Sequence, residues 1–244
     1  MSAPAAPAAP ATARVAPADS TAGPDLGRVT SVAYDQGLAA GLLLLHAELG
    51  TRTLPAGPGG HVLLPPELVA GCDHVTTPEG PRQRDLRTGK DYGEAELGRV
   101  AAGPESAAGE LVALRITGAG PGPDDHWGAG ILAVRLGVAD RLLRQAADHL
   151  HTRTVQGANT LGLPMVRGLV ADAASGVAEV RALLATGPDQ AAVRRSHRAL
   201  DASGRTCLHL FGAAGFLTGG PGSTVRASEL LADVYAPVHD QESP

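Results

Sequence analysis

The chain has 244 residues and a formal net charge of −5 with no basic block, so it lacks the positive stripe of a nucleic-acid-binding protein. Hydrophobic residues make up 43% of it but aromatic residues only 2%, so a core has to be built from Ala, Val and Leu. The longest uncharged apolar run, residues 36–47, is shorter than the roughly 20 residues that a membrane-spanning helix needs.

The N-terminal region consists of an arm and a helix. Residues 1–24 are rich in Ala and Pro and have no apolar core of the kind a secretory signal carries, so we expect a disordered arm. Residues 25–49 carry leucines and valines at helical spacing, and Gly50 stands where a C-cap glycine belongs. Gly37 and Gly41 inside this helix indicate either a local cost or close helix packing.

Residues 51–125 are broken repeatedly by Gly and Pro. Two short strand-like runs lie between the breakers, HVLL at 61–64 and ELVALRI at 110–116. We therefore expect residues 25–126 to comprise the N-terminal helix and a reduced, irregular β/loop region.

Residues 127–236 are predicted to form an antiparallel four-helix bundle, followed by a tail at 237–244. The first helix has a clean apolar stripe from Leu132 to Leu150, and the second follows Pro164. The third runs from about Asp189 to Leu210, where Gly212 ends it. The fourth covers 223–235, with Ser223 or Thr224 as its N-cap. The fold class is thus mainly α.

The cysteines, the histidines and the known short catalytic motifs give little further indication of function. Cys72 and Cys207 are far apart and make no C-x-x-C motif, which favours a reducing cytoplasm. His149 and His151 are two apart on a helix and face different ways, so no metal site is expected. No nucleophile elbow, zinc-protease or Walker motif occurs.

Three stretches of the bundle carry a family resemblance. The first, GILAVRLGVADRLLRQAADHLHTRTVQG at 130–157, has an A-x-x-L-G-x-A core and an R-x-x-F-G motif that reads Arg153-Thr-Val-Gln156-Gly157 here. The second, at 164–184, has Ala171-Asp172 and Arg181 at the family's spacing. The third is His209-Leu-Phe-Gly212-Ala-Ala-Gly215-Phe216, followed by Ala232-Asp233. Together they resemble the C-terminal domain of the acyl-CoA dehydrogenase family, in a truncated and degenerate form. HVTTPEGP at 74–81 resembles the family's T-E-P-x-x-G-S-D segment more weakly.

The resemblance implies flavin-dependent α,β-desaturation of an acyl thioester, carried by CoA or a carrier protein. FAD would be the cofactor, and Arg153 would bind its pyrophosphate. The other residues that match FAD-contacting positions of the family are Gln156, His209, Gly212 and Gly215. Gln156 replaces the family's Phe, His209 its Gln, and Ala213 its second Gly.

The family places its catalytic Glu either after the R-D helix or at the start of the first bundle helix. The positions that match are Gln241 in one case and Trp127 and Gly128 in the other, and none is acidic. Candidate substitutes stand beside them, namely Asp125 and His126 at the bundle entrance and Asp240 and Glu242 in the tail.

Three functions remain open. The first is a reduced acyl-CoA dehydrogenase-like oxidoreductase of specialised biosynthesis, whose site is complete alone or is completed by a second subunit. The second is a flavin-free dehydratase, isomerase or cyclase on the same bundle. The third is a non-catalytic partner that keeps the bundle for oligomerisation. In each case the expected partners are an acyl thioester or related small molecule and a homo- or hetero-oligomer, with no nucleic acid and no membrane.

Overall fold

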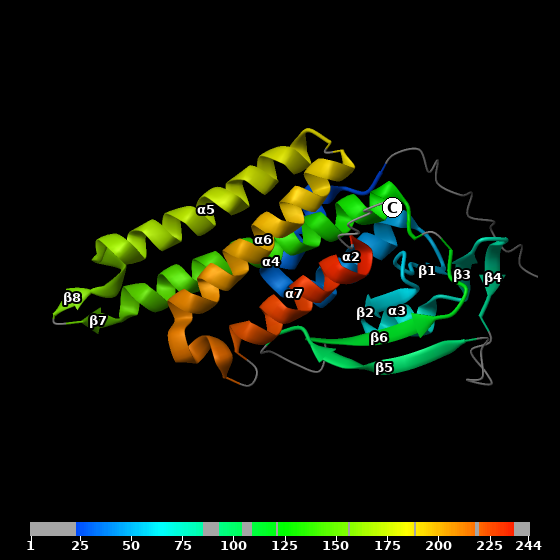
Figure 1. Ribbon diagram of the computed structural model, residues 1–244, viewed down its shortest axis with the longest axis horizontal. Coiled ribbons are helices and arrows are strands. Elements are labelled where there is room, and N and C mark those ends of the chain that lie inside the picture. The colour runs from blue at the N-terminus through cyan, green and yellow to red at the C-terminus, as the bar shows by residue number, and fades with distance from the viewer. Residues whose placement is uncertain are drawn as a thin grey trace, which may run out of the picture.

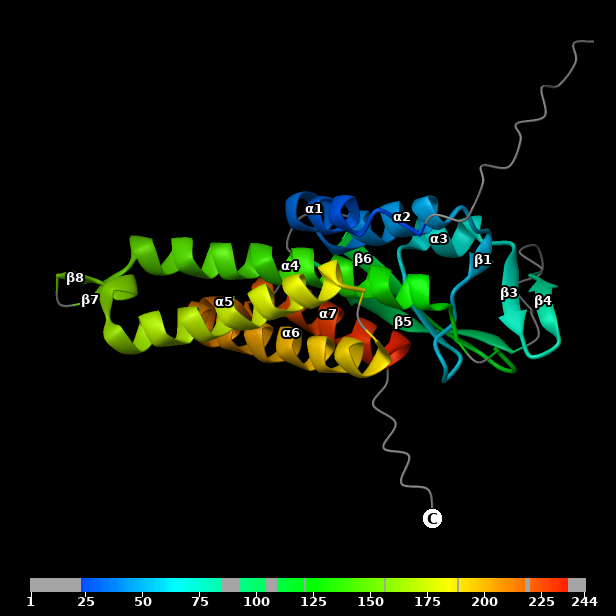
Figure 2. The same cartoon turned by 90° about the horizontal axis from the view of Figure 1, so that it is seen from above.

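The computed structural model describes residues 23–84, 93–103, 109–120, 122–155, 157–187, 189–217 and 220–236. Its helices are α1 (Leu26–Gln36), α2 (Leu38–Leu49), α3 (Pro66–Gly71), α4 (Asp125–Thr152), α5 (Pro164–Ala185), α6 (Gln190–Phe211) and α7 (Pro221–Tyr235), with 3-10 turns η2 (Thr160–Gly162) and η3 (Gly212–Phe216). The fold is mainly helical, as expected. The helices form a long body with the β-strands β1 to β6 at one end and a small hairpin at the other (Figures 1 and 2).

The helix expected over residues 25–49 is present as two helices, α1 and α2. They meet at Gly37, whose φ of 93° is a conformation that side chains with a Cβ rarely adopt. Gly41 has a different role, because a Cβ there would lie 2.8 Å from the Cβ of Ala33 and 3.2 Å from Val134. One glycine therefore breaks the helical run, and the other permits close packing.

Helix α4 is the spine of the molecule. In Figure 2, α1 and α2 lie along one side of it and α5, α6 and α7 along the other. The contact with α1 is so close that a Cβ on Gly137 would lie 2.2 Å from the backbone oxygen of Thr30. A Cβ on Gly130 would likewise lie 2.1 Å from Leu45 of α2. The two glycines thus set how near the N-terminal helices come to the bundle.

The β region comprises two three-stranded sheets. In one, β2 (His61–Leu64), β6 (Glu110–Ile116) and β5 (Glu94–Ala101) are antiparallel neighbours in that order. In the other, β3 (His74–Thr77) pairs with β1 (Thr53–Leu54) in parallel and with β4 (Gly80–Gln83) in antiparallel fashion. The two strands expected from sequence, β2 and β6, are confirmed.

The four-helix bundle is confirmed as α4 to α7. The hairpin of β7 (Thr154–Val155) and β8 (Ala158–Asn159) joins α4 to α5. Gly212 ends α6 with a φ of 58°, as expected. The expected cap of the last helix is wrong, because α7 begins at Pro221 with Gly220 as N-cap, and the Ser223 hydroxyl donates back to the Gly220 carbonyl. Proline is well suited to a first helical turn because its missing N–H has no helical partner there.

A polar cluster lies inside the bundle. Arg135 of α4 is 1% exposed, and it donates to Nδ1 of His197 (2.7 Å), Oγ of Ser228 (3.0 Å) and the carboxylate of Asp201. Burial, and secondarily the Arg135 charge, lowers the pKa of His197 to about 3, so its ring is neutral at physiological pH. This cluster joins α4, α6 and α7 by directed contacts.

One buried core extends from the N-terminal helices through the sheets into the bundle, and it includes Val29, Val62, Val134 and Leu231. It therefore crosses the boundary between residues 126 and 127. Among the described residues, no helix combines the length and apolar character needed to cross a membrane.

Candidate functional site

A cavity of about 340 Å³ lies where α4 begins, and we call it the α4 N-terminal cavity. The end of α2, the strands β1 and β3 and the loop before α4 form its walls. Such a volume is at the lower end of the range for small-molecule sites. Its polar lining residues are Glu48, Thr51, Thr53, Thr76, Asp124 and His126.

The acids and bases expected here are only partly brought together. His126 lines the cavity, whereas Asp125 is exposed on the first turn of α4 and is not part of the lining. Asp124 lines the cavity as the N-cap of α4, and its carboxylate accepts a hydrogen bond from the Trp127 backbone N–H at 2.9 Å. Glu48 was not singled out in the sequence, since it reads as an ordinary helix-end acid. Its carboxylate pairs with Arg28 at 2.7 Å.

Trp127 and Gly128 stand where the family resemblance expects a catalytic carboxylate, and Trp127 contributes the side chain there. Its side chain is 2% exposed, lines the cavity, and packs edge-on against Tyr235 (5.5 Å between ring centroids) and His46 (6.4 Å). Within the described part of the chain, its indole Nε1 has no hydrogen-bond partner. At this position the cavity wall is therefore an indole backed by two further rings, and not a carboxylate.

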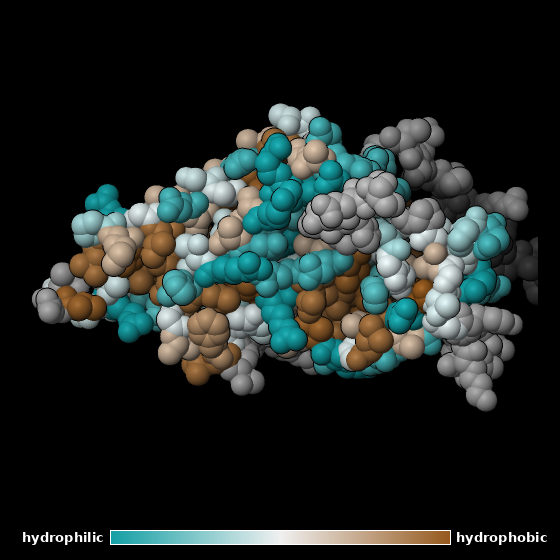
Figure 3. Space-filling view, viewed as in Figure 1, coloured by the Kyte–Doolittle hydropathy of each residue, from teal (hydrophilic) through white to brown (hydrophobic). Residues whose placement is uncertain are grey.

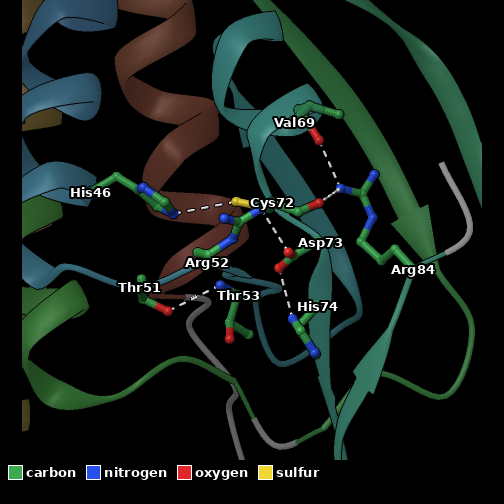
Figure 4. A network of polar contacts seen from close by, with 9 residues as sticks. All are labelled: His46, Thr51, Arg52, Thr53, Val69, Cys72, Asp73, His74 and Arg84. Carbon is green, nitrogen blue, oxygen red and sulfur yellow. Dashed lines mark hydrogen bonds and ion pairs between the residues drawn. The ribbon is translucent and has the colours of Figure 1, made fainter. Parts of the chain in front are cut away.

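A group of polar contacts lies beside the cavity (Figure 4). It extends from Thr51 and Thr53, which line the cavity, to Arg84 after β4. The Cys72 thiol lies 3.3 Å from Nε2 of His46, and both side chains are buried. Burial raises the pKa of Cys72 to about 11 and lowers that of His46, so the pair is a neutral thiol and a neutral imidazole. A buried, protonated thiol is a poor nucleophile, which indicates that this pair has a packing role.

Arg84 anchors the other side of the network. Its guanidinium is bidentate with Glu94 (2.6 and 3.1 Å) and also donates to the carbonyls of Val69 and Cys72. Figure 4 shows the contacts to the two carbonyls of the α3 segment. Arg84 directly follows β4 and Glu94 begins β5, so their pairing ties the two sheets together.

Two of the residues expected to hold a cofactor, Arg153 and Gly212, are linked by contacts in the C-terminal half of α4. Arg153 is the exposed C-cap of α4, and its guanidinium lies 3.4 Å from Nε2 of His149. The His149 ring lies 5.5 Å from the ring of Phe211, which directly precedes Gly212. Arg153 and the glycine loop, 59 positions apart in sequence, thus meet through His149 and Phe211. We call Arg153, His149, Phe211 and Gly212 the distal group.

Packing accounts for part of the glycine loop. A Cβ on Gly215 would lie 3.1 Å from the Leu208 carbonyl oxygen and 3.1 Å from the Cβ of Phe211, and one on Gly222 would lie 2.6 Å from the Gly215 carbonyl oxygen. Gly212 differs, since open space surrounds it and only its positive φ requires glycine. His209 is exposed in the last turn of α6. The remaining candidates, Gln156, Asp240 and Glu242, lie outside the described residues.

A second cavity, of about 580 Å³, lies between α1, α2, the middle of α4 and the start of α7. Its apolar lining includes Leu38, Leu43, Leu142 and Phe211, and Arg141 and Gln145 contribute polar groups. Phe211, a member of the distal group, is also part of the lining of this cavity. No group of three or more His, Cys, Asp or Glu side chains suited to a metal ion occurs in the described ranges.

Comparison with known proteins places this geometry in a fold family. No family model matches the sequence, and the curated proteins contain no significant match. A variant of the Tcur3481–Tcur3483 steroid ACAD (acyl-CoA dehydrogenase) is similar in structure at 17% identity and a TM-score of 0.52, over 86% of this chain and 70% of that one. The chain therefore has the acyl-CoA dehydrogenase fold, which confirms the resemblance at the level of fold.

Two further solved structures are more distant. The ChsE4–ChsE5 complex from Mycobacterium tuberculosis is 21% identical, with a TM-score of 0.46 over 73% of this chain and 53% of that one. A glutaryl-coenzyme A dehydrogenase in its glutaryl-CoA complex is 16% identical, with a TM-score of 0.43 over 69% and 48%. The aligned part of this chain spans about half the length of each.

Proposed function

We propose that this chain is a subunit of an acyl-CoA dehydrogenase-like assembly and that it completes the flavin site of a second subunit of the same fold. The assembly would desaturate an acyl thioester. One observation carries this proposal, namely that the distal group and the α4 N-terminal cavity lie at opposite ends of one helix.

Helix α4 has 28 residues, so its ends are about 42 Å apart. Arg153 therefore lies too far from the chain's own α4 N-terminal cavity to act there together with His126. Arg153 is exposed at the C-terminal end of α4 and Gly212 is half-buried, so a second subunit could reach them there. A cofactor held by both groups of residues has to lie between two chains.

The distal group suits the phosphate end of such a cofactor. The Arg153 guanidinium is exposed, and among the described residues its one side-chain contact is the 3.4 Å approach to Nε2 of His149. A free guanidinium is well shaped for bidentate binding of a pyrophosphate. When bound, a flavin supplies the hydride-accepting chemistry, and Arg153 would orient it and neutralise its phosphate charge.

The base of the reaction is assigned to the partner. Trp127, buried against His46 and Tyr235, stands where the resemblance expects a carboxylate, and an indole cannot take up a proton at neutral pH. The apolar second cavity offers room for an acyl group, with Arg141 beside it. The name of the similar ACAD joins two gene products, which fits an assembly of unequal subunits.

The test begins with tagged chain purified from its native cells under gentle conditions. We expect a complex with a second subunit, visible in native mass measurement, that carries an oxidised-flavin absorbance band. Arg153→Ala should weaken flavin binding by the complex about tenfold or more, since one charged contact to phosphate is lost. Arg144→Ala, on the same helix and also exposed, is the matched control and should leave flavin binding unchanged.

Two results would contradict this function. One is a monomer that binds FAD stoichiometrically by itself, and the other is an Arg153→Ala complex with unaltered flavin affinity. Turnover by the complex should survive Asp125→Asn and His126→Ala, because the base comes from the partner. A large loss of turnover in either variant would instead place proton transfer in this chain's own cavity.

A further inference from the structure

The second cavity has an apolar wall inside the molecule. Brown, apolar residues also lie on the surface at the hairpin end of the bundle in Figure 3, and one of the exposed apolar residues, Met165, is 80% exposed. The apolar residues of the second cavity differ from these, because Leu38, Leu142 and Phe211 are 1%, 4% and 5% exposed and still border open space. An apolar ligand body in this cavity would therefore be withdrawn from water.

Arg141 supplies the only positive charge among the described residues that line the second cavity. Small-molecule sites of this volume, about 580 Å³, are mostly apolar and contain a few polar groups that orient the ligand. The lining thus fits a ligand that has an apolar body and a group able to pair with a cation.

The Arg141 guanidinium lies beside the break between α1 and α2. Its Nη1 donates to the backbone carbonyl of Asp35 at 3.2 Å, two residues before Gly37. This is its only side-chain contact among the described residues. Because a guanidinium has five N–H donors, most of them are available to a ligand in the cavity.

The first turn of α2 lines the same cavity through Leu38, Ala39 and Ala40. The first hydrogen bond of this helix is made by the Gly37 carbonyl, which accepts from the Gly41 N–H at 3.1 Å, and no side chain caps the helix. Leu38 and Ala39 are 1% and 7% exposed, so water has little access to their backbone. Helix ends of this kind are completed by caps, waters or ligands. A negatively charged group in the cavity would meet these N–H donors in addition to Arg141.

The other polar residues of the lining are compatible with an anion. Gln145 lies one turn after Arg141 on the same face of α4, and Thr224 of α7 also lines the cavity, so both can donate neutral hydrogen bonds. Asp35 is the one acidic residue among the described lining. It is exposed, so solvent and salt screen its repulsion of a bound anion.

We propose that the second cavity binds an aliphatic chain that ends in a carboxylate, with the carboxylate paired with Arg141 beside the start of α2. For a chain carried by a thioester, the inference rests on the proposed function and narrows its substrate to an acyl group with a carboxylate at the far end. A free carboxylic acid presents the same chemistry and requires neither flavin nor a second subunit.

Calorimetric titration of the full chain without flavin tests the site. We expect octanoate to bind saturably, with one molecule per chain. Octan-1-ol has a similar apolar body without the charge and should bind about tenfold or more weakly, because the charge-assisted contact is lost. Acetate has the charge without the body and should show no measurable binding.

Three variants separate the charge from the apolar wall. Arg141→Ala should weaken octanoate binding about tenfold and leave octan-1-ol binding unchanged, which a general collapse of the cavity would not do. Ala40→Leu adds bulk at a half-buried lining position and should weaken the binding of both. Arg144→Ala is the matched control, since Arg144 is exposed on the same helix, pairs with Asp148 and does not line the cavity. Circular dichroism verifies that each variant is folded.

Two thioesters distinguish the sources of the carboxylate. If it belongs to the acyl group, the assembly with the second subunit should bind octanedioyl-CoA about tenfold more tightly than octanoyl-CoA, and Arg141→Ala should remove this difference. If the ligand is a free acid, the assembly should bind the two thioesters equally and octanoate should displace neither.

Two results would overturn the inference. One is octanoate that binds no more tightly than octan-1-ol, which would show that the cavity is merely apolar. The other is an Arg141→Ala chain with unaltered octanoate affinity. Either result can occur while Arg153→Ala still weakens flavin binding by the assembly, so the failure of this inference is distinguishable from the failure of the proposed function.

Discussion

At the scale of single residues, the molecule places several polar side chains where the sequence does not suggest them. Arg135 lies inside the bundle with His197, although arginine is rarely buried fully. The free-energy cost of removing a guanidinium from water is offset only when its hydrogen bonds are made. Here three side chains accept hydrogen bonds from Arg135. His197 contributes the neutral acceptor, so the cluster depends on its remaining unprotonated.

We therefore expect the stability of the fold to depend on pH through His197. Its pKa is about 3 when folded and 6.5 when unfolded, so below pH 6.5 the unfolded chain binds the proton and the folded chain does not. Stability is then lost at about 1.4 kcal/mol per pH unit as the pH falls towards 3. Between pH 7.5 and 5.0, the free energy of unfolding in urea should fall by about 2 kcal/mol more in the wild type than in His197→Gln. Equal losses in the two proteins would contradict this.

At the scale of elements, close approach between helices is set by glycine. A Cβ on Gly137 would clash with the Thr30 carbonyl oxygen, whereas one on Gly128 of the same helix would meet nothing within 4 Å. Gly137→Ala should therefore destabilise the protein by about 1–3 kcal/mol through overpacking. Gly128→Ala should stabilise it by about 0.5–1 kcal/mol, because alanine is the better helix former. Urea unfolding of the pair measures both, and a Gly137→Ala variant as stable as Gly128→Ala would show that α1 has room to move.

The elements also show what could be predicted. The bundle helices are evident in the sequence because Leu and Ala recur at helical spacing over long runs. Strand β5 was missed, since residues on both of its faces are exposed and no alternation marks it. The break at Gly37 is ambiguous because a glycine inside a helical pattern has several explanations, and only the backbone shows that φ is positive.

The site was harder to predict than the fold. Arg153 and Gly212 were singled out separately, but their proximity depends on the tertiary contact of His149 with Phe211. Glu48 lines the cavity because the end of α2 packs beside α4, and this tertiary contact cannot be predicted from the local sequence pattern. Trp127 was matched to a catalytic position, yet its burial between His46 and Tyr235 depends on residues 81 and 108 positions away.

At the scale of the whole molecule, one core joins the N-terminal helices, the sheets and the bundle. Tyr235 at the end of α7 strengthens this connection, because its hydroxyl accepts a hydrogen bond from the Leu63 backbone N–H in β2 at 3.2 Å. The division of the chain at residue 126 remains a proposal, and the unfolding of the molecule can test it.

Trp127 is the only tryptophan of the chain and lies where the β region meets the bundle. We expect its fluorescence and the helical circular dichroism signal to change together during urea unfolding, because a shared core unfolds cooperatively. Separate transitions would show that residues 25–126 and 127–236 unfold independently. The Trp127→Phe variant, followed by circular dichroism, verifies that the probe itself does not alter the transition.

The central position of α4 has a consequence for synthesis of the chain. Helices α1 and α2 pack on α4, which lies far later in the sequence. At roughly 5–20 residues per second, the ribosome needs several seconds to travel from Leu49 to Thr152. During that interval the apolar faces of α1 and α2 are uncovered, so the nascent chain passes through a stage at which it depends on shielding by the ribosome or by chaperones.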